Sequence, residues 1–171
     1  TCGGHMRHKS IVITIVIVLL LVGCKKEDLP KEIRDEILFD ELPEPIENRF
    51  FSVYVGPETV RSGEAIYIGV DLLRGRRNVY ATIPDPNDKD NALRLQLERY
   101  KNSSVWLMPP SWLYADGRVA YGSQPNANDV VEGERAIYTP FDWDEDTVPI
   151  RVDNGNQYIS FEVNVRGNLK E

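Results

Sequence analysis

The sequence predicts an all-β protein whose main body is a single antiparallel β-sandwich. In residues 65–72, 93–98 and 158–165, apolar side chains occupy every second position. Successive side chains of a strand point to opposite faces, so this alternation indicates strands that are buried on one side. No long helical period interrupts the pattern after residue 50, and the composition, 42% hydrophobic and 27% charged, is that of an ordinary globular domain.

Further short apolar runs separated by turn residues indicate additional strands. About ten strands in roughly 120 residues suit a two-sheet sandwich or a barrel. In chain order, the predicted strands are residues 51–55, 65–72, 79–83, 93–98, 104–108, 112–115, 118–122, 136–139, 147–152 and 158–165.

The dipeptide Asn154-Gly155 predicts a β-hairpin, because a two-residue turn requires positive φ at both positions. That turn would set Ile150 opposite Ile159 and Val148 opposite Phe161, with all four side chains on one face. Pro149 has no N–H to donate, so its strand is expected at an edge or paired on one side only.

The segment from Gly56 to Glu64, followed by the strand that contains Ile66, resembles the first-strand bend and first turn of immunoglobulin-like domains. The resemblance implies an immunoglobulin-like or related sandwich. The Cys and Trp marks of antibody domains are absent.

The N-terminal region has the pattern of an export signal. A short basic stretch, residues 6–9, precedes a run of twelve residues at 11–22 that is apolar except for Thr14 and is too short to span a bilayer. The run ends in Leu21-Val22-Gly23-Cys24, which resembles the bacterial lipobox. The resemblance implies cleavage before Cys24 and acylation of its sulfur, and two or three acyl chains would anchor a soluble body firmly.

This reading divides the chain into four parts. Residues 1–5 are expected to be a tag or an upstream extension, 6–23 the signal peptide, 24–48 the acylated Cys and an acidic tether, and 49–171 the β-sandwich. Cleavage removes two basic residues and no acidic one, so the formal net charge falls from −7 to about −9. An acidic body argues against a nucleic-acid partner, because phosphate binding requires clustered cations.

The start of the mature chain, Cys24-Lys25-Lys26-Glu27-Asp28, resembles that of many Bacteroidota lipoproteins, in which a Lys followed by two acidic residues is associated with surface export. Here the pattern is Lys26-Glu27-Asp28, which begins one residue further from Cys24 than in those proteins. Lys25 stands where some other Gram-negative bacteria use Asp to retain lipoproteins at the inner membrane. The resemblance implies an outer-membrane protein that faces either the periplasm or the exterior.

The residue inventory limits the chemistry that the mature chain can perform. Its only histidines, His5 and His8, precede the cleavage site, and its only remaining Cys is the acylated one. Ser-His-Asp triads, Cys-His pairs, His-ligated zinc and disulfides are therefore excluded. Carboxylate pairs of the glycosidase type stay open.

Alternating acids at Asp142, Asp144 and Asp146, with Asp153 further on, suggest a Ca²⁺ loop. The spacing departs from an EF-hand, because Thr147 stands where the turn needs Gly and Asp153 replaces the bidentate Glu. A looser surface Ca²⁺ site and a solvated acidic loop both remain open, and no other cofactor is expected.

A turn at Asp116-Gly117 would place Trp112, Tyr114 and Tyr121 on one face of a hairpin. Three aromatic rings in a flat strip can stack on sugar rings; the alternative is that they fill the core.

The basic cluster formed by Arg74, Arg76 and Arg77 could contact anionic groups of lipid, polysaccharide or a protein partner, or it could be a solvated turn.

The sequence therefore predicts a non-catalytic, lipid-anchored envelope protein whose β-sandwich is a protein-interaction or assembly module. One alternative is a glycan-binding surface lipoprotein. A second alternative is a carboxylate-dependent glycan hydrolase.

Overall fold

The computed structural model describes residues 44–75, 78–123, 125 and 128–166. All of them belong to the second of two units into which the chain divides, residues 31–171. The predicted signal peptide, Cys24 and most of the predicted tether lie outside the described residues. Within the described ranges the regular structure is entirely β, and no helix there is long and apolar enough to cross a bilayer.

One sheet of the sandwich has the order β1-β2-β4-β8-β7, and β12 also pairs with β4. Its longest pairing joins β2 to β4 in antiparallel register from Phe51↔Leu72 to Gly56↔Tyr67. The strands are β1 (Ile46–Glu47), β2 (Phe51–Gly56), β4 (Ala65–Leu72), β7 (Glu98–Arg99), β8 (Val105–Leu107) and β12 (Ile137–Tyr138).

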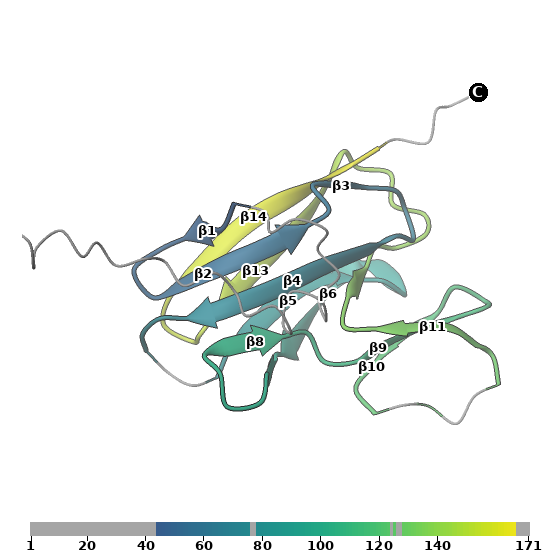
Figure 1. The fold of residues 1–171 in the computed structure, drawn as a ribbon. Helices are drawn as coiled ribbons and strands as arrows, with labels where there is room; N and C mark the ends of the chain where they lie inside the picture. The colour runs from purple at the N-terminus through teal and green to yellow at the C-terminus, as the bar shows by residue number, and fades with distance from the viewer. Residues whose placement is uncertain (1–43, 76–77, 124, 126–127, 167–171) are drawn as a thin grey trace, which may run out of the picture. The chain divides into compact units, whose positions relative to one another are not determined.

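The second sheet has the order β3-β14-β13-β5-β6, and Figure 1 shows it behind β2 and β4. All its pairings are antiparallel except the parallel contact of β3 with β14. The strands are β3 (Thr59–Val60), β5 (Tyr80–Asp85), β6 (Asp88–Gln96), β13 (Thr147–Asp153) and β14 (Tyr158–Val165).

The two sheets confirm the predicted β-sandwich, and their strand orders agree with the order in immunoglobulin-like domains. The path β2-β4-β8-β7 corresponds to the A-B-E-D sheet of such domains, and β5-β13-β14 corresponds to the C-F-G sheet, with β6 added beside C. The chain changes sheets between β2 and β3, where the Gly56–Pro57 bond is cis.

A third sheet, of order β10-β9-β11, lies to one side in Figure 1. It is inserted between the E-like strand β8 and the F-like strand β13. Its strands are β9 (Ser111–Tyr114), β10 (Val119–Tyr121) and β11 (Val130–Glu134). Asn87, in the β5–β6 turn, ties it to the sandwich, because the Asn87 side chain both donates to Val119 O and accepts from Val119 N.

The core lies between the two large sheets. Alternate side chains of β2 and β4 meet those of β5, β13 and β14, as the period-two pattern predicts. Fully or almost fully buried members include Val53, Ile66, Ile68, Val70, Ala81, Ile83, Val148, Ile150 and Val152.

Each of the ten predicted strands has a counterpart in the structure, whereas β1, β3, β7 and β11 were not predicted. Strand pairing begins at Ile46↔Val53, before the predicted boundary at residue 49. The last residues assigned to the tether therefore belong to the sheet.

The predicted register of the last hairpin is wrong by two residues. Ile150 lies opposite Phe161 and Val148 opposite Val163. The loop contains four residues rather than two, because the Asn154 carboxamide accepts from Asn156 N and Gln157 N and closes a wider turn. A shift of two preserves the buried face, since strand periodicity is two.

The predicted register at Asp116-Gly117 is wrong by one residue. The loop includes Ala115, and Gly117, at φ 85°, completes a three-residue turn. Val119 then lies opposite Leu113, and Tyr121 lies opposite Ser111. An odd shift moves one strand's side chains to the other face, so Tyr121 is separated from Trp112 and Tyr114.

Replacing Ile68 by Ala should destabilise the protein strongly. Ile68 is fully buried at the centre of β4, and removing its side chain leaves a cavity that costs about 2–5 kcal/mol. Chemical denaturation with a two-state fit measures the loss. Val131→Ala is the matched control, since Val131 is 68% exposed and should change stability by less than about 0.5 kcal/mol. Equal effects in both variants would contradict the assignment of the core.

Candidate functional site

The outer face of the five-stranded sheet carries the most chemically distinctive surface of the described residues. Strands β5, β6, β13 and β14 turn alternate side chains into the core and the others away from it. Most of the outward side chains on β6, β13 and β14 are exposed, so no described element covers this face.

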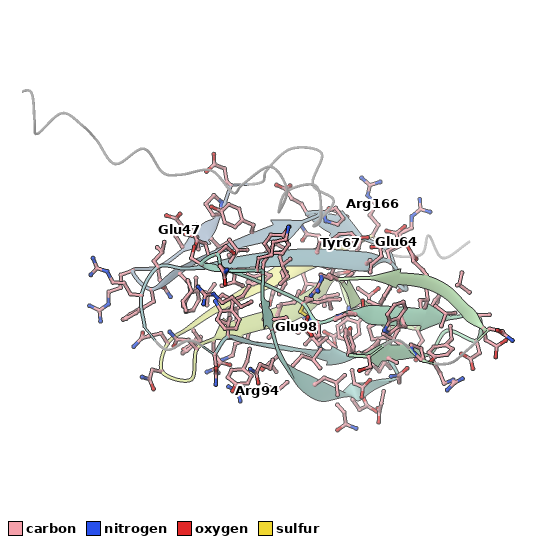
Figure 2. The ribbon with its side chains drawn as sticks, turned by 60° about the horizontal axis from the view of Figure 1, so that its bottom comes forward. Glu47, Glu64, Tyr67, Arg94, Glu98 and Arg166 are labelled. Carbon is pink, nitrogen blue, oxygen red and sulfur yellow. The ribbon has the colours of Figure 1, made fainter. Side chains whose placement is uncertain are left out.

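Two arginines on this face stack on two tyrosines. Arg94 Cζ lies 3.8 Å from the centre of the Tyr80 ring, and Arg151 Cζ lies 4.1 Å from that of Tyr158. Such guanidinium–ring contacts stabilise by about 0.5–1 kcal/mol when exposed and by more when a partner excludes water. We call these four residues the Tyr–Arg surface. Figure 2 shows Arg94 on the side of the sandwich opposite to Tyr67 and Glu47 of the other sheet.

Asp153 holds the Tyr–Arg surface in place. Its carboxylate is buried, at 6% exposure, and accepts from Arg94 Nη2 at 2.8 Å and from Gly155 N at 2.9 Å. The hydrogen bond that Arg94 donates to Asp153 raises the pKa of Arg94 above its ordinary value. The guanidinium is thus fixed over the Tyr80 ring instead of extending into solvent.

A pair of prolines interrupts the sheet beside this surface. The ladder between β13 and β5 runs from Asp153↔Tyr80 to Arg151↔Thr82 and then stops. Continuing this register by two residues sets Pro149 opposite Pro84, where no ladder pair forms, and both prolines line the same cavity. Neither proline has an N–H, so neither can donate across the gap. The expectation that the strand of Pro149 lies at an edge or pairs on one side only is wrong, because β13 lies inside the sheet and pairs with both β14 and β5. Pro149 itself is paired only with Glu162 of β14, since the ladder to β5 ends at Arg151.

A groove of about 720 Å³ opens where the two strands separate. Apolar side chains, those of Ile83, Trp143, Ile150 and Phe161, form part of its lining. Polar and charged residues also line it: Thr82, Lys89, Asp90, Asn91, Arg151, Ser160 and Glu162. We call this feature the proline groove. An apolar pocket with several convergent polar groups is the usual form of a binding site.

The three aromatic residues predicted as a glycan-binding strip do not share a face. Trp112 packs on Gly133 of β11, where a Cβ would overlap the indole ring, and its Nε1 donates to Gly122 O. Tyr121 faces the other way and packs against the core, and Tyr114 is stacked under Arg118 with Cζ 4.9 Å from the ring centre. A flat strip of three rings is therefore not formed.

Tyr114 also borders a second cavity, of about 590 Å³, together with Arg118, Val131 and Phe141. Val131 and Phe141 are two of the most exposed large apolar side chains in the described ranges. Trp112 and Tyr121 do not line this cavity.

The four acids predicted as a Ca²⁺ loop serve separate purposes. Asp142 and Asp144 hold Lys89, whose Nζ lies 3.7 and 3.3 Å from their carboxylates, whereas Asp153 holds Arg94. The backbone carbonyl of Asp146 accepts from Val165 N. No group of three or more potential metal ligands forms within the described ranges.

Of the predicted basic cluster, Arg74 is exposed in the turn after β4, and its backbone N donates to Phe50 O at 2.9 Å. Arg76, Arg77 and the predicted acylation site Cys24 lie outside the described residues.

A buried polar cluster lies on the other side of the inserted sheet. The hydroxyls of Tyr121 and Tyr138 and the Glu134 Oε2 atom are buried without a hydrogen-bond partner. Burial raises the pKa of Glu134, and burial likewise raises that of both phenols. These groups do not line the proline groove.

Comparisons add no relative. The chain matches no family model, and neither the curated proteins nor the solved structures include a significant match.

The proline groove and the Tyr–Arg surface were missed in the sequence. Pro149 was singled out for its one-sided pairing, but Pro84 follows the predicted strand 79–83 and was given no role. An assumed immunoglobulin-like strand order would have placed the two prolines on neighbouring strands. The stacking of Arg on Tyr requires the cross-strand register, which no local pattern provides.

Glu134→Gln should stabilise the protein at neutral pH. The pKa of Glu134 is higher in the folded state than in the unfolded state. The contribution of its protonated carboxyl group to stability is therefore fully present below the unfolded pKa, near 4.3, and is lost as pH rises through the folded pKa. Gln cannot ionise, so the variant should be more stable than the wild type at pH 7 and nearly unchanged at pH 4. Thermal unfolding at both pH values measures the difference.

Glu132→Gln is the control for that measurement, because Glu132 is an exposed acid on the same strand. Its stability should follow that of the wild type at both pH values. A Glu134→Gln variant that is less stable than wild type at pH 7 would show that the charged carboxylate stabilises the fold.

Proposed function

We propose that the chain is a non-catalytic, lipid-anchored envelope protein whose β-sandwich docks a protein partner on the outer face of β5, β6, β13 and β14. The observation that carries this proposal is the exposed Tyr–Arg surface beside the proline groove. Tyr and Arg are the side chains, together with Trp, that most often dominate the binding energy of protein interfaces.

The geometry of this face supports a docking role. Asp153 and the two tyrosine rings hold the guanidinium groups of Arg94 and Arg151, so little side-chain entropy is lost when a partner binds. The strands beneath the side chains are fixed by the core. A groove next to rigid anchors gives a partner side chain a place to insert.

The anchoring part of the proposal rests on the lipobox resemblance at Leu21–Cys24. Acyl chains on Cys24 would confine the domain to a membrane surface, and confinement favours partners in the same envelope layer, since it raises their effective concentration. The outer membrane is the site that the residues after Cys24 favour.

The glycan-binding alternative loses its main support because the aromatic strip is not formed. The hydrolase alternative requires two facing carboxyl groups, one of which stays protonated. Glu134, whose pKa is raised by burial, lies outside the groove lining. We therefore retain the docking function alone.

Cys24→Ser should release the protein from membranes. In a bacterium that processes lipoproteins, the wild-type chain should sediment with the envelope and show the mass of a cleaved, acylated product. The variant cannot be acylated at position 24, so it should keep its leader and lose the lipid mass. Membrane fractionation and intact-mass spectrometry report both. A wild-type chain with an uncut leader or a free thiol at Cys24 would contradict the proposal.

The double variant Arg151→Ala/Tyr158→Ala should lose the partner. After cross-linking in intact cells and mild detergent extraction, the proteins that co-purify with the wild-type chain should fall at least about tenfold, as expected for loss of interface anchors. The control is Tyr114→Ala/Arg118→Ala, which removes the Tyr–Arg stack of the inserted sheet. Equal capture by the two double variants would place the docking surface elsewhere.

A further inference from the structure

The proline groove contains two backbone carbonyl groups that the sheet leaves without a donor. Asn154 N donates to Gln157 O, so the backbone of residue 154 points toward β14. Successive residues of a strand point their N–H and C=O groups to opposite neighbours, and those of residues 149, 151 and 153 therefore point toward β5. Leu97 N donates to Val79 O, so the groups of residues 80, 82 and 84 on β5 face β13.

Pro84 and Pro149 therefore occupy a position where two ordinary residues would exchange two N–H···O=C bonds. Each carbonyl instead faces a nitrogen that carries no hydrogen. Pro84 is buried and Pro149 is exposed, so a ligand that enters the groove can supply the donors that the sheet does not. The two carbonyl oxygens can therefore accept hydrogen bonds from a ligand that lies between the strands.

The charges around the groove favour a cation as the source of those donors. No ion pair is found for the carboxylates of Asp90 and Glu162 within the described ranges. The two cations of the lining are engaged elsewhere, since Lys89 is held by Asp142 and Asp144 and Arg151 is stacked on Tyr158. The chain as a whole is acidic, with a formal net charge of −7, which attracts cationic groups.

The apolar lining favours a cation on a long aliphatic stem. Ile83 and Ile150 are almost completely buried below the groove, and the half-buried rings of Trp143 and Phe161 also line it. Aromatic rings attract ammonium groups, and apolar walls accept methylene groups. An ammonium group has three N–H donors, which suit several acceptors at a single point.

From these observations we infer that the proline groove binds the side chain of a lysine presented by the partner protein. The lysine stem contacts the apolar lining, and the ammonium group donates to the Pro84 and Pro149 carbonyls near Asp90 and Glu162. This inference deepens the proposed function and rests on it.

The test uses a lysine probe on the full-length protein in detergent. Nα-acetyl-lysine N-methylamide is titrated while the indole N–H of Trp143 and the amides of Asp90 and Arg151 are followed by NMR. A single side chain should bind with a Kd of about 1–10 mM. The norleucine and arginine counterparts should bind at least tenfold more weakly, because the first lacks the ammonium group and the second presents a wide planar fork.

Two variants test the chemistry of the groove. Asp90→Asn/Glu162→Gln should weaken the lysine probe at least tenfold, whereas Asp88→Asn, on the same strand but outside the lining, should leave binding unchanged. Pro84→Val/Pro149→Val restores both donors, so it should close the strands, abolish binding and raise the unfolding temperature.

The inference is overturned if norleucine or arginine binds as tightly as lysine, or if the carboxylate variant binds normally. The carboxylate variant alone decides the matter should the double valine variant not fold. If the lysine probe does not bind while Arg151→Ala/Tyr158→Ala still loses its partner, the docking function stands and only the lysine assignment fails.

Discussion

Backbone pairing is the constraint on which this structure depends. Each strand must bond its N–H and C=O groups to its neighbours while it turns every second side chain into the shared core. The five-stranded sheet meets this requirement from Tyr80↔Asp153 to Thr82↔Arg151 and cannot meet it where Pro84 faces Pro149. The groove lies at this interruption of the ladder, while Ile83 and Ile150 keep both strands packed on the core.

The same sheet holds the side chains of the proposed docking face rigidly. Asp153 is buried and anchors Arg94 of β6 over Tyr80 of β5. On the neighbouring strands β13 and β14, Arg151 stacks on Tyr158. These side chains stand on strands whose opposite face forms the core. A surface of this kind presents cationic and aromatic groups in a fixed arrangement on an otherwise acidic chain, which favours selective over nonspecific association.

The two wrongly predicted hairpin registers have different consequences for which side chains are buried. At Asn154 the loop is two residues longer than expected, and every buried side chain keeps its face. At Asp116 the loop is one residue longer, and Tyr121 moves from the outside to the core. The glycan hypothesis depended on that single residue of register. Turn chemistry identifies a hairpin, but the loop length is decided by contacts such as the Asn154 side-chain bonds and the left-handed Gly117.

Local alternation was sufficient to determine the all-β class, ten strand positions and most of the core, because side-chain burial in a strand follows its period of two. The missing N–H of Pro149 wrongly suggested an edge or one-sided strand, because β13 pairs on both sides. Only the tertiary structure decided which strands are neighbours, and hence that Pro84 and Pro149 come together. It also decided that Arg94 reaches Asp153, fifty-nine residues later, and that Trp112 covers Gly133. Contacts of that kind join segments far apart in the chain, and a pattern read along one strand contains no information about its partner.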